Sequence, residues 1–204
     1  MKFQIIVADP PWGAFKDSLK MNDIKRGASD NYNTLTTKQI SNLLIKDITD
    51  PNGALLALWI PSSLLQDGLD VMKLWGFNHK QTYVWVKIKK NILLSSKPNQ
   101  LLSFGMGRLM RQTHELCLIG INNKNIYKLL KNKSQRSVCF AQNTKHSTKP
   151  EDLQDSLDEM FPDCSKIELF SRRQRPNWIC IGNESPTTVG EDINVSVNSL
   201  KDEV

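Results

Sequence analysis

Short apolar runs recur along the chain, and their pattern predicts strands that are buried on both faces. Residues 3–8 end in Ile-Ile-Val-Ala, and residues 54–60 are apolar throughout. A continuous apolar run of this length is typical of a strand in a parallel sheet that helices cover on both sides. Further runs predict strands at residues 83–86, 115–121, 138–141, 167–170 and 178–181.

Helices are predicted between these runs from their caps and from apolar residues at helical spacing. Residues 36–39, Thr-Thr-Lys-Gln, form a capping box that begins a first helix. A second helix starts at Ser62 or Ser63 and stops at Gly76, and a third runs from Pro150 to about Met160. Strands that alternate with helices predict an α/β domain of three layers, α-β-α, with a mostly parallel sheet.

The remaining segments have no clear period. Residues 13–35 and 87–111 are predicted to be long loops, which in compact domains are usually functional or disordered. Residues 185–204 are polar, with four acids, one lysine and no large aromatic side chain. We expect a domain of residues 1–184 followed by a disordered polar tail over residues 185–204.

Composition argues against several classes of protein. No apolar stretch is long enough to span a bilayer, and the first residues lead directly into a strand, so we expect no membrane segment and no signal peptide. The four cysteines are scattered without a Cys-x-x-Cys pair, and the three histidines lie far apart, so no metal site is expected. Buried, reduced thiols indicate a cytoplasmic compartment.

The net charge of +6 is concentrated in the centre of the chain. Residues 73–149 carry fifteen Lys or Arg and one acid, Glu115, whereas residues 150–204 carry five basic and twelve acidic residues. Such a basic segment is electrostatically costly unless a polyanion neutralises it, as nucleic-acid phosphates do. The sequence therefore predicts a nucleic-acid partner; the alternative is a lysine-rich surface exposed to solvent.

The residues that narrow the function most follow the first strand: Asp9, Pro10, Pro11 and Trp12. Neither proline has a backbone N–H, so the strand ends here in a rigid turn. The Asp9 carboxylate and the Pro10 carbonyl are then two acceptors beside the indole of Trp12, at the strand end where α/β sheets bind ligands. These groups suit a nucleobase that has been taken out of its stack. The alternative is a proline-rich turn with Trp12 in the core.

This tetrapeptide resembles the catalytic motif of the mRNA-adenosine-methyltransferase-type family of N6-adenine methyltransferases. Further blocks resemble the family in its own order: residues 32–35, 58–61, 76–77, 85–87, 114–120, 146–151, 167–172, 176–178 and 182–184. The resemblance covers about residues 3–184. The compact length is similar to that of the bacterial and phage branch, which places the protein in the cytoplasm of a bacterial or phage-infected cell.

The resemblance implies a Rossmann-like methyltransferase domain that uses S-adenosylmethionine, with a circularly permuted motif order. Asp9 and Pro10 would accept both N–H bonds of the adenine amine and stabilise the positive charge that grows as nitrogen attacks the sulfonium methyl. Pro11 completes the turn, and Trp12 would stack on the base. Positioning supplies the rest, and no metal is required. We expect DNA as the substrate, with RNA as the alternative.

The resemblance also implies the other site residues. Lys149 would meet the carboxylate of the cofactor and Glu184 its ribose hydroxyls, while Glu168 and Arg172 either contact the cofactor or pair with each other. The full set of implied cofactor contacts is Asp9, Ser147, Lys149, Glu168, Phe170, Arg172, Asn183 and Glu184. The implied substrate contacts are Tyr32 as a second wall for the base, Lys87, Arg108 and Arg111 at phosphates, and Glu115. Glu115 either lines the substrate pocket or forms a salt bridge with Arg108 or Arg111.

Other functions are left open by the sequence. The chain could be a catalytically silent nucleic-acid-binding partner within a heterodimer, although the intact tetrapeptide and Lys149 count against this. It could methylate a small molecule or a protein amine, although the basic centre counts against this. A homodimer would lengthen the footprint on DNA, and a DNA enzyme would fit a restriction-modification system. The loops over residues 13–31 and 88–107, where target specificity would lie, match no motif.

Overall fold

The computed structural model describes residues 1–13, 34–90, 97–105, 109–142 and 148–202. Its strands form one seven-stranded sheet in the order β5-β3-β4-β2-β1-β6-β7. The bounds are β1 Ile5–Ala8, β2 Leu55–Ile60, β3 Asn78–Ile88, β4 His114–Ile121, β5 Val138–Gln142, β6 Lys166–Leu169 and β7 Ile179–Ile181. β4 is antiparallel to β2 and β3, and all other neighbouring pairs are parallel. The prediction of a mostly parallel α/β sheet is confirmed.

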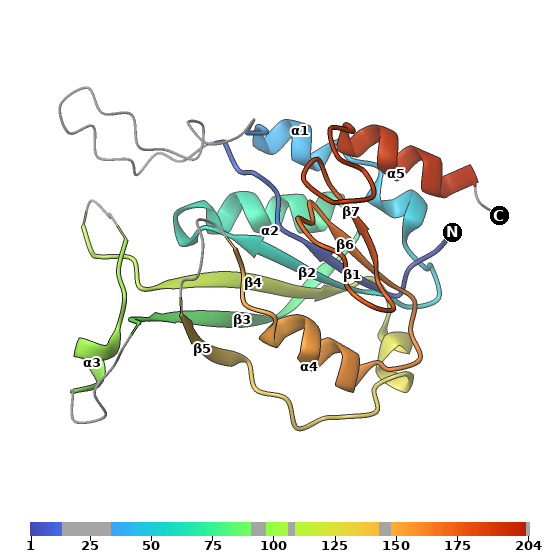
Figure 1. Cartoon of the computed structure of the whole chain (residues 1–204). Coiled ribbons are helices and arrows are strands. Elements are labelled where there is room, and N and C mark those ends of the chain that lie inside the picture. The colour runs from blue at the N-terminus through green and yellow to red at the C-terminus, as the bar shows by residue number, and fades with distance from the viewer. Residues whose placement is uncertain (14–33, 91–96, 106–108, 143–147, 203–204) are drawn as a thin grey trace.

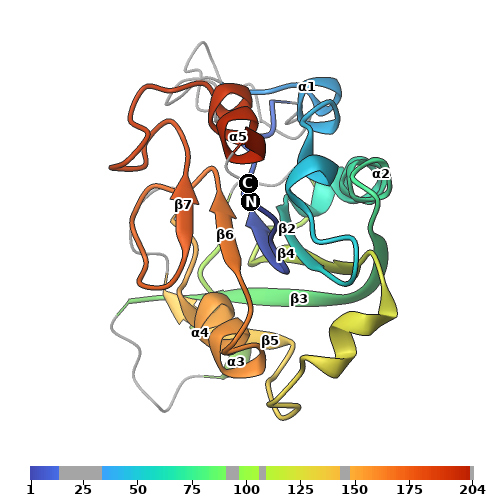
Figure 2. The ribbon, with the colours of Figure 1, turned by 90° about the vertical axis from the view of Figure 1, so that its right-hand side faces the viewer.

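Helices cover both faces of this sheet. The α-helices are α1 Thr37–Ser41, α2 Leu65–Leu74, α3 Pro98–Leu101, α4 Asp152–Met160 and α5 Ile193–Asp202, and the 3-10 helices are η2 Ile45–Ile48, η3 Ser62–Leu64 and η4 Lys124–Lys128. Figure 2 shows α1, α2 and α5 on one side of the sheet and α4 on the other. No helix in the described ranges is long and apolar enough to cross a bilayer. The expected three layers are therefore present (Figure 1).

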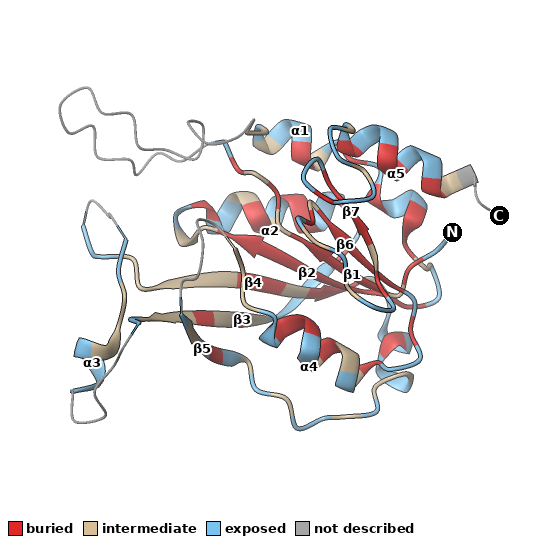
Figure 3. Ribbon diagram, in the orientation of Figure 1, coloured by how far each residue is buried: buried red, intermediate tan, exposed pale blue. Residues whose placement is uncertain are grey.

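Each face of the sheet has its own core because successive side chains of a strand point to opposite faces. Along β2, Leu56, Leu58 and Ile60 belong to the core under α1, α2 and α5, whereas Ala57 and Trp59 belong to the core under α4. All six residues of β2 are buried, as the continuous apolar run predicted. Figure 3 shows the same burial along the central strands.

The predicted caps explain where α1 begins and where α2 ends. The expected start of the second helix at Ser62 or Ser63 is wrong, because these residues form η3 and α2 begins at Leu65 without a side-chain cap. Thr36 accepts a hydrogen bond from the backbone of Gln39, and the Gln39 side chain accepts one from the Thr36 backbone, so the capping box is present. α1 ends after Ser41, and the chain continues in η2 rather than in the longer helix that the apolar spacing suggested. Gly76, with φ at +89°, turns the chain out of α2 in a conformation that few other residues adopt.

The C-terminal segment differs from the sequence expectation. Within residues 185–204, which were expected to be disordered, α5 is a ten-residue helix. Its Ile193, Val197 and Leu200 are buried in the core beside α1 and α2. Their spacing of four and three residues forms one apolar stripe, which the low overall hydrophobicity of the segment concealed. The tail thus completes the helical layer instead of leaving the domain.

The second expected loop is also partly ordered. Residues 87–111 were predicted to be a loop, but β3 and β4 extend beyond the other strands and α3 lies near their far end (Figure 1). Leu102 pairs with Ile88 and Gly105 pairs with Gln112 in isolated bridges. We call the described residues between Lys89 and Thr113 the arm. Its local pairing has no apolar periodicity, which explains why the sequence gave no sign of it.

Candidate active site

Strands β1, β3 and β4 bring charged side chains to the same end of the sheet. Asp9 directly follows β1, Lys87 lies near the end of β3, and Glu115 lies near the start of β4. β4 is antiparallel to β2 and β3, and β1 is parallel to β2. The first residues of β4 therefore lie at the end of the sheet where β1, β2 and β3 finish. Each of the three charged residues is two positions from a residue of the core under α4. Strand alternation therefore turns all three toward the α4 side of the sheet.

Lys149 joins these side chains into one group. Its Nζ atom lies 2.8 Å from Oδ1 and 2.7 Å from Oδ2 of Asp9. The same atom lies 3.3 Å from Oε2 of Glu115, whose Oε1 accepts a hydrogen bond from Lys87 at 2.5 Å. The Lys149 side chain is only 9% exposed, and its ammonium sits 5.6 Å from the centre of the Trp59 ring. Two ammonium groups thus alternate with two carboxylates, which balances their charges.

The surroundings shift the pKa values of Asp9, Glu115 and Lys149 in different directions. Desolvation raises the pKa of Asp9, and the opposing Lys149 does not fully offset it. Burial would also raise the pKa of Glu115, but Lys149 and Lys87 together hold that pKa below its usual value. Burial would lower the pKa of Lys149, but Asp9 and Glu115 hold it above its usual value. Lys149 is therefore a permanent cation that two carboxylates share.

The turn after β1 is held by its own backbone and by the segment that leads to α1. The carbonyl of Pro10 accepts the N–H of Trp12 at 2.9 Å, and the carbonyl of Pro11 accepts the N–H of Leu35 at 2.8 Å. Gly13 in turn donates its N–H to the Leu35 carbonyl at 2.9 Å. A carbonyl oxygen has two lone pairs, so Pro10 retains one acceptor site. Together with the Asp9 carboxylate, it can still receive an amine.

Trp12 lies in the core, as the alternative interpretation of a proline-rich turn predicted. Its side chain is 4% exposed within the core, and its Nε1 donates to the backbone carbonyl of Trp59 at 2.9 Å. This bond ties the turn to the end of β2, next to β1 in the sheet. The geometry therefore supports a role for Trp12 in fixing the turn, and its stacking on a base stays a prediction.

The ends of β6 and β7 bring together part of the expected cofactor set. Phe170 follows β6 with φ at +61°, a conformation that is rare for a non-glycine residue and that turns the chain sharply. A Cβ atom at Gly182 would lie 2.6 Å from the Ser171 carbonyl oxygen, so only glycine allows the two chain segments to approach this closely. Asn183 and Glu184 follow this contact and are exposed.

The expected pair between Glu168 and Arg172 is not formed. Arg172 instead lies 3.6 Å from Glu184, and Glu168 lies 3.7 Å from Arg173. The reason is strand alternation, because Glu168 points to the α4 side whereas Arg172 follows the turn at Phe170. Glu168 is buried, its Oε2 has no hydrogen-bond partner among the described residues, and desolvation raises its pKa against the opposing charge of Arg173.

The structure also corrects two expectations for the substrate residues. The carboxylate of Glu115 pairs with Lys87 and Lys149 and not with Arg111, whose guanidinium lies 5.7 Å from the centre of the Phe104 ring. Lys87, expected at a phosphate, points its ammonium toward Glu115. Tyr32, Arg108 and Ser147 lie outside the described residues. The pair of Lys87 and Glu115 was not predicted from the sequence, because only the antiparallel register between β3 and β4 brings the two residues together.

A second group of contacts fixes α4, which the chain enters directly after Lys149. The guanidinium of Arg175 donates to Glu151 at 2.8 Å, to Asp155 at 2.5 Å and to Asp158 at 2.7 Å. Trp178 adds a bond from its Nε1 to Asp158 at 3.0 Å. These contacts join the acidic face of α4 to the segment between β6 and β7. They hold the helix whose start lies close after Lys149 in the chain.

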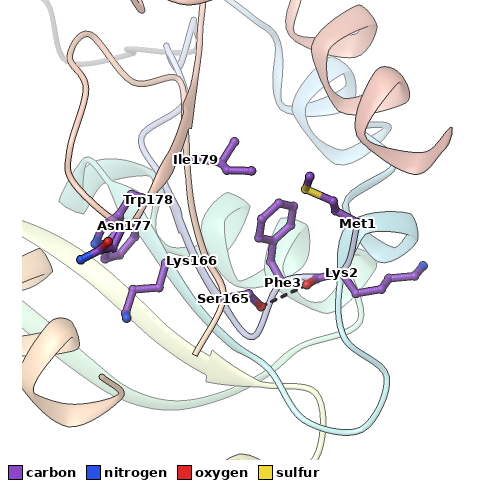
Figure 4. A pocket seen from close by; sticks show the side chains of 8 residues that line it. All are labelled: Met1, Lys2, Phe3, Ser165, Lys166, Asn177, Trp178 and Ile179. Atoms are coloured by element: carbon purple, nitrogen blue, oxygen red, sulfur yellow. Dashed lines mark hydrogen bonds between the residues drawn. The ribbon is translucent and has the colours of Figure 1, made fainter. Parts of the chain in front are cut away.

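A cavity lies where β1, β6 and β7 begin, at the end of the sheet opposite to Asp9, and Figure 4 shows the side chains that line it. It has a volume of about 460 Å³ and is lined by Met1, Lys2, Phe3, Ser165, Lys166, Asn177, Trp178 and Ile179. The ammonium of Lys166 donates to the carbonyls of Pro162 and Cys164 at 3.2 and 3.3 Å. Its charge is paired with Asp158 at 3.5 Å, and the cavity contains none of the expected site residues.

Two groups of exposed basic residues stand out between residues 73 and 149. Four exposed ones lie on the arm at the edge that carries Asp9: Lys89, Lys90, Lys97 and Arg111. Others lie beyond the far end of β4, in and after η4: Lys124, Lys128, Lys131 and Lys133. A polyanion that reaches Asp9 would meet the first group. The basic residues between 73 and 149 therefore lie only partly near the site.

Comparison with known proteins agrees with this geometry. The chain is 27% identical over 189 residues to the N(6)-adenosine-methyltransferase MT-A70-like protein of Drosophila melanogaster, covering 90% of this chain and 27% of that protein. It is equally similar, at 27%, to the N(6)-adenosine-methyltransferase catalytic subunit METTL3 of Homo sapiens, covering 90% of this chain and 28% of that protein. The chain thus spans about a quarter of the length of these relatives.

A shorter relative is covered more fully. The chain is 26% identical over 201 residues to the Type II methyltransferase M.MunI of a Mycoplasma species, covering 91% of this chain and 78% of that protein. The model of the MT-A70 family matches residues 3–184, a region that contains all seven strands and every site residue named above. The chain belongs to the MT-A70 family, whose methyltransferases use S-adenosylmethionine.

Proposed function

We propose that this protein is a DNA N6-adenine methyltransferase. The observation that carries the proposal is the carboxylate of Asp9 at the end of β1. It accepts two hydrogen bonds from Lys149 and is followed by the rigid turn at Pro10. The two acceptors of this turn can receive the exocyclic amine of an adenine that has left its stack. Family membership supplies the chemical class, and the geometry supplies the roles proposed below.

The residues of the chain act on the amine by position and charge. An adenine amine is a poor nucleophile because its lone pair is conjugated into the ring. Hydrogen bonds to the Asp9 carboxylate and the Pro10 carbonyl favour a tetrahedral nitrogen and stabilise the positive charge that develops there. S-adenosylmethionine supplies the methyl group when it is bound. Asp9 is also the nearest acceptor for the proton that the methylated amine must lose.

The side chains at the ends of β6 and β7 fit S-adenosylmethionine by their chemistry. Arg172 and Glu184 pair across this edge at 3.6 Å and are both partly exposed, so each can exchange its partner for a ligand group. The carboxylate of Glu184 suits a ribose diol, Arg172 suits a carboxylate, and Asn183 offers both donor and acceptor groups. Phe170 adds an apolar surface beside them.

DNA is proposed over RNA because of the relative that the chain covers more fully. The N(6)-adenosine-methyltransferases among the relatives support RNA, but the chain covers about a quarter of their length. The Type II methyltransferase M.MunI supports DNA, and the chain covers 78% of it. The exposed lysines of the arm lie at the site edge and are suited to phosphates of either polymer. A role in a restriction-modification system would fit the DNA proposal.

The proposal is tested by incubating the purified protein with methyl-labelled S-adenosylmethionine and, separately, duplex DNA, single-stranded DNA and RNA. We expect label in N6-methyldeoxyadenosine from DNA after digestion to nucleosides. Label in RNA alone would replace DNA by RNA as the substrate. Cofactor binding without label in any polymer would favour a missing partner subunit, and DNA binding without cofactor binding would favour a catalytically silent subunit.

A further inference from the structure

We infer that Lys87 is a positioning residue for methyl transfer, which acts through Glu115 and Lys149 on Asp9 and does not contact nucleic-acid phosphates. This inference rests on the proposed function. Lys87 lies near the end of β3 and points inward, whereas a basic residue on the surface would be free to bind phosphate.

The geometry around Lys87 shows where its charge is used. Its Nζ lies 2.5 Å from Oε1 of Glu115 and 4.9 Å from the centre of the Trp85 ring, and the Lys87 side chain is only 18% exposed. Trp85 is fully buried, and its Nε1 donates to the Ala141 carbonyl at 3.0 Å, so the ring is fixed. The ammonium is therefore held between a carboxylate and an aromatic face, both of which favour a cation.

The sheet register explains why Lys87 reaches Glu115. Trp85 lies directly opposite Glu115 in the antiparallel pair of β3 and β4, and Lys87 is two residues further along the same face. Such diagonal neighbours are within reach of long side chains. Lys89, two residues beyond Lys87, is exposed on the arm and has no such acid opposite, since Glu115 is the only acid between residues 73 and 149.

The link from Lys87 to Asp9 runs through a shared cation. Lys149 lies within hydrogen-bond distance of both Asp9 oxygens and 3.3 Å from Oε2 of Glu115. While Lys87 neutralises Glu115, Lys149 is directed mainly to Asp9. Without the charge of Lys87, two carboxylates compete for one ammonium, and Glu115 can draw Lys149 away. Asp9 then loses the support that fixes the direction of its lone pairs.

This role makes a different kinetic prediction from a phosphate contact. A displacement of the acceptor at the amine costs rate at the chemical step, where a misplacement of about 1 Å can cost on the order of 100-fold. A lost phosphate contact weakens binding instead and lowers the salt dependence of the binding constant by about one unit of slope. The two outcomes appear in separate measured quantities.

The test compares Lys87→Met with Lys89→Met in the full chain, with kcat, the KM for DNA and the salt slope of DNA binding measured for each. For K87M we expect kcat to fall by about 10- to 100-fold, with the KM for DNA and the salt slope as in wild type. For K89M we expect a higher KM and a salt slope lower by about one unit. Lys87→Arg, which keeps the charge, is expected to recover most of the lost kcat.

Two further variants keep the inference testable. In a Glu115→Gln background, the K87M change should cause no additional loss of kcat, because the link has already been cut. If K87M folds poorly in thermal unfolding, Lys87→Gln replaces it in the same cycle. A K87M enzyme with wild-type kcat and a reduced salt slope would overturn the inference, as would additive effects of K87M and E115Q. A wild-type protein that binds DNA but does not bind S-adenosylmethionine would instead refute the proposed function.

Discussion

The ammonium of Lys149 donates hydrogen bonds to both carboxylate oxygens of Asp9, at 2.8 and 2.7 Å, across 140 residues of sequence. The pair joins the turn after the first strand to the segment that leads into α4. A carboxylate has about four lone-pair sites, so this grip leaves acceptor capacity on the outer side of Asp9. The bond therefore fixes the orientation of the acceptor without consuming it.

The first prediction concerns this pair. Asp9→Asn keeps the shape of the side chain but loses its charge and places an N–H₂ group where an acceptor is needed. We expect kcat to fall by about 100- to 1,000-fold, the cost of losing one charge-stabilising group in a transition state. Labelled methyl transfer to DNA measures it. The exposed Asp163, changed to Asn, is the matched control and should leave kcat as in wild type. Wild-type turnover in D9N would contradict the proposed role.

The second prediction concerns stability against pH. The pKa of Glu115 is held below its ordinary value of 4.5 in the folded protein. The stabilisation from its ionised form is therefore complete above 4.5 and is lost as the pH falls through the lowered folded value. E115Q should cost about 2 kcal/mol of unfolding free energy near neutral pH, the scale of a charge-assisted hydrogen bond.

Urea unfolding of both proteins from about pH 7 to about pH 4 checks this. The difference between wild type and E115Q should shrink as the pH falls, because the wild type alone loses the contribution. Asp9 and Glu168 have raised pKa values and act in the opposite sense. Glu168 is common to both proteins, whereas E115Q also removes the part of the Asp9 shift that Glu115 causes. A difference that stays constant over this range would show that Glu115 does not titrate below its ordinary value.

The third prediction concerns the attachment of α4. Arg175→Met removes one cation that contacts three acids, Glu151, Asp155 and Asp158, and leaves these acids close together. We expect a loss of roughly 2 kcal/mol in the free energy of unfolding, because the side chain is mostly buried and multiply bonded. Arg136, which is exposed and donates to the backbone carbonyl of Ser134, gives the control: R136M should change stability by less than about 0.5 kcal/mol.

The fourth prediction separates an ordered tail from a disordered one. Val197 and Val195 lie on the same helix, α5, but Val197 is 1% exposed and Val195 is 54% exposed. We expect Val197→Ala to destabilise the fold by roughly 2 kcal/mol through lost burial and an unfilled space. Val195→Ala should change it by less than about 0.5 kcal/mol. Denaturant unfolding measures both, and equal effects would show that α5 does not pack on the core.

Local patterns in the sequence were sufficient to predict the main elements of the fold. The apolar run over residues 54–60 and the capping box at Thr36 each specify a local structure by themselves, and both are confirmed. The position of Asp9 at the end of β1 could also be predicted, because the prolines stop the strand wherever the sheet places it. These features depend on residues that are neighbours in the chain.

Side-chain partners could not be predicted in the same way. Whether Arg172 pairs with Glu168 or with Glu184 depends on the turn at Phe170 and on the close approach at Gly182, which set the directions of these side chains. The bond between Lys87 and Glu115 depends on the register of β3 against β4, and no local pattern encodes that register. The burial of α5 depends on a surface built by distant segments. Each of these is a relation between residues far apart in the sequence.

The central place of β1 has a consequence for synthesis on the ribosome. β1 is translated first, and β2 can pair with one of its edges early, but its other edge is covered only by β6, about 160 residues later. During that interval the nascent chain exposes an apolar strand edge, the kind of surface that captures other strands. Chain elongation would thus leave one edge of β1 unpaired until β6 has emerged from the ribosome.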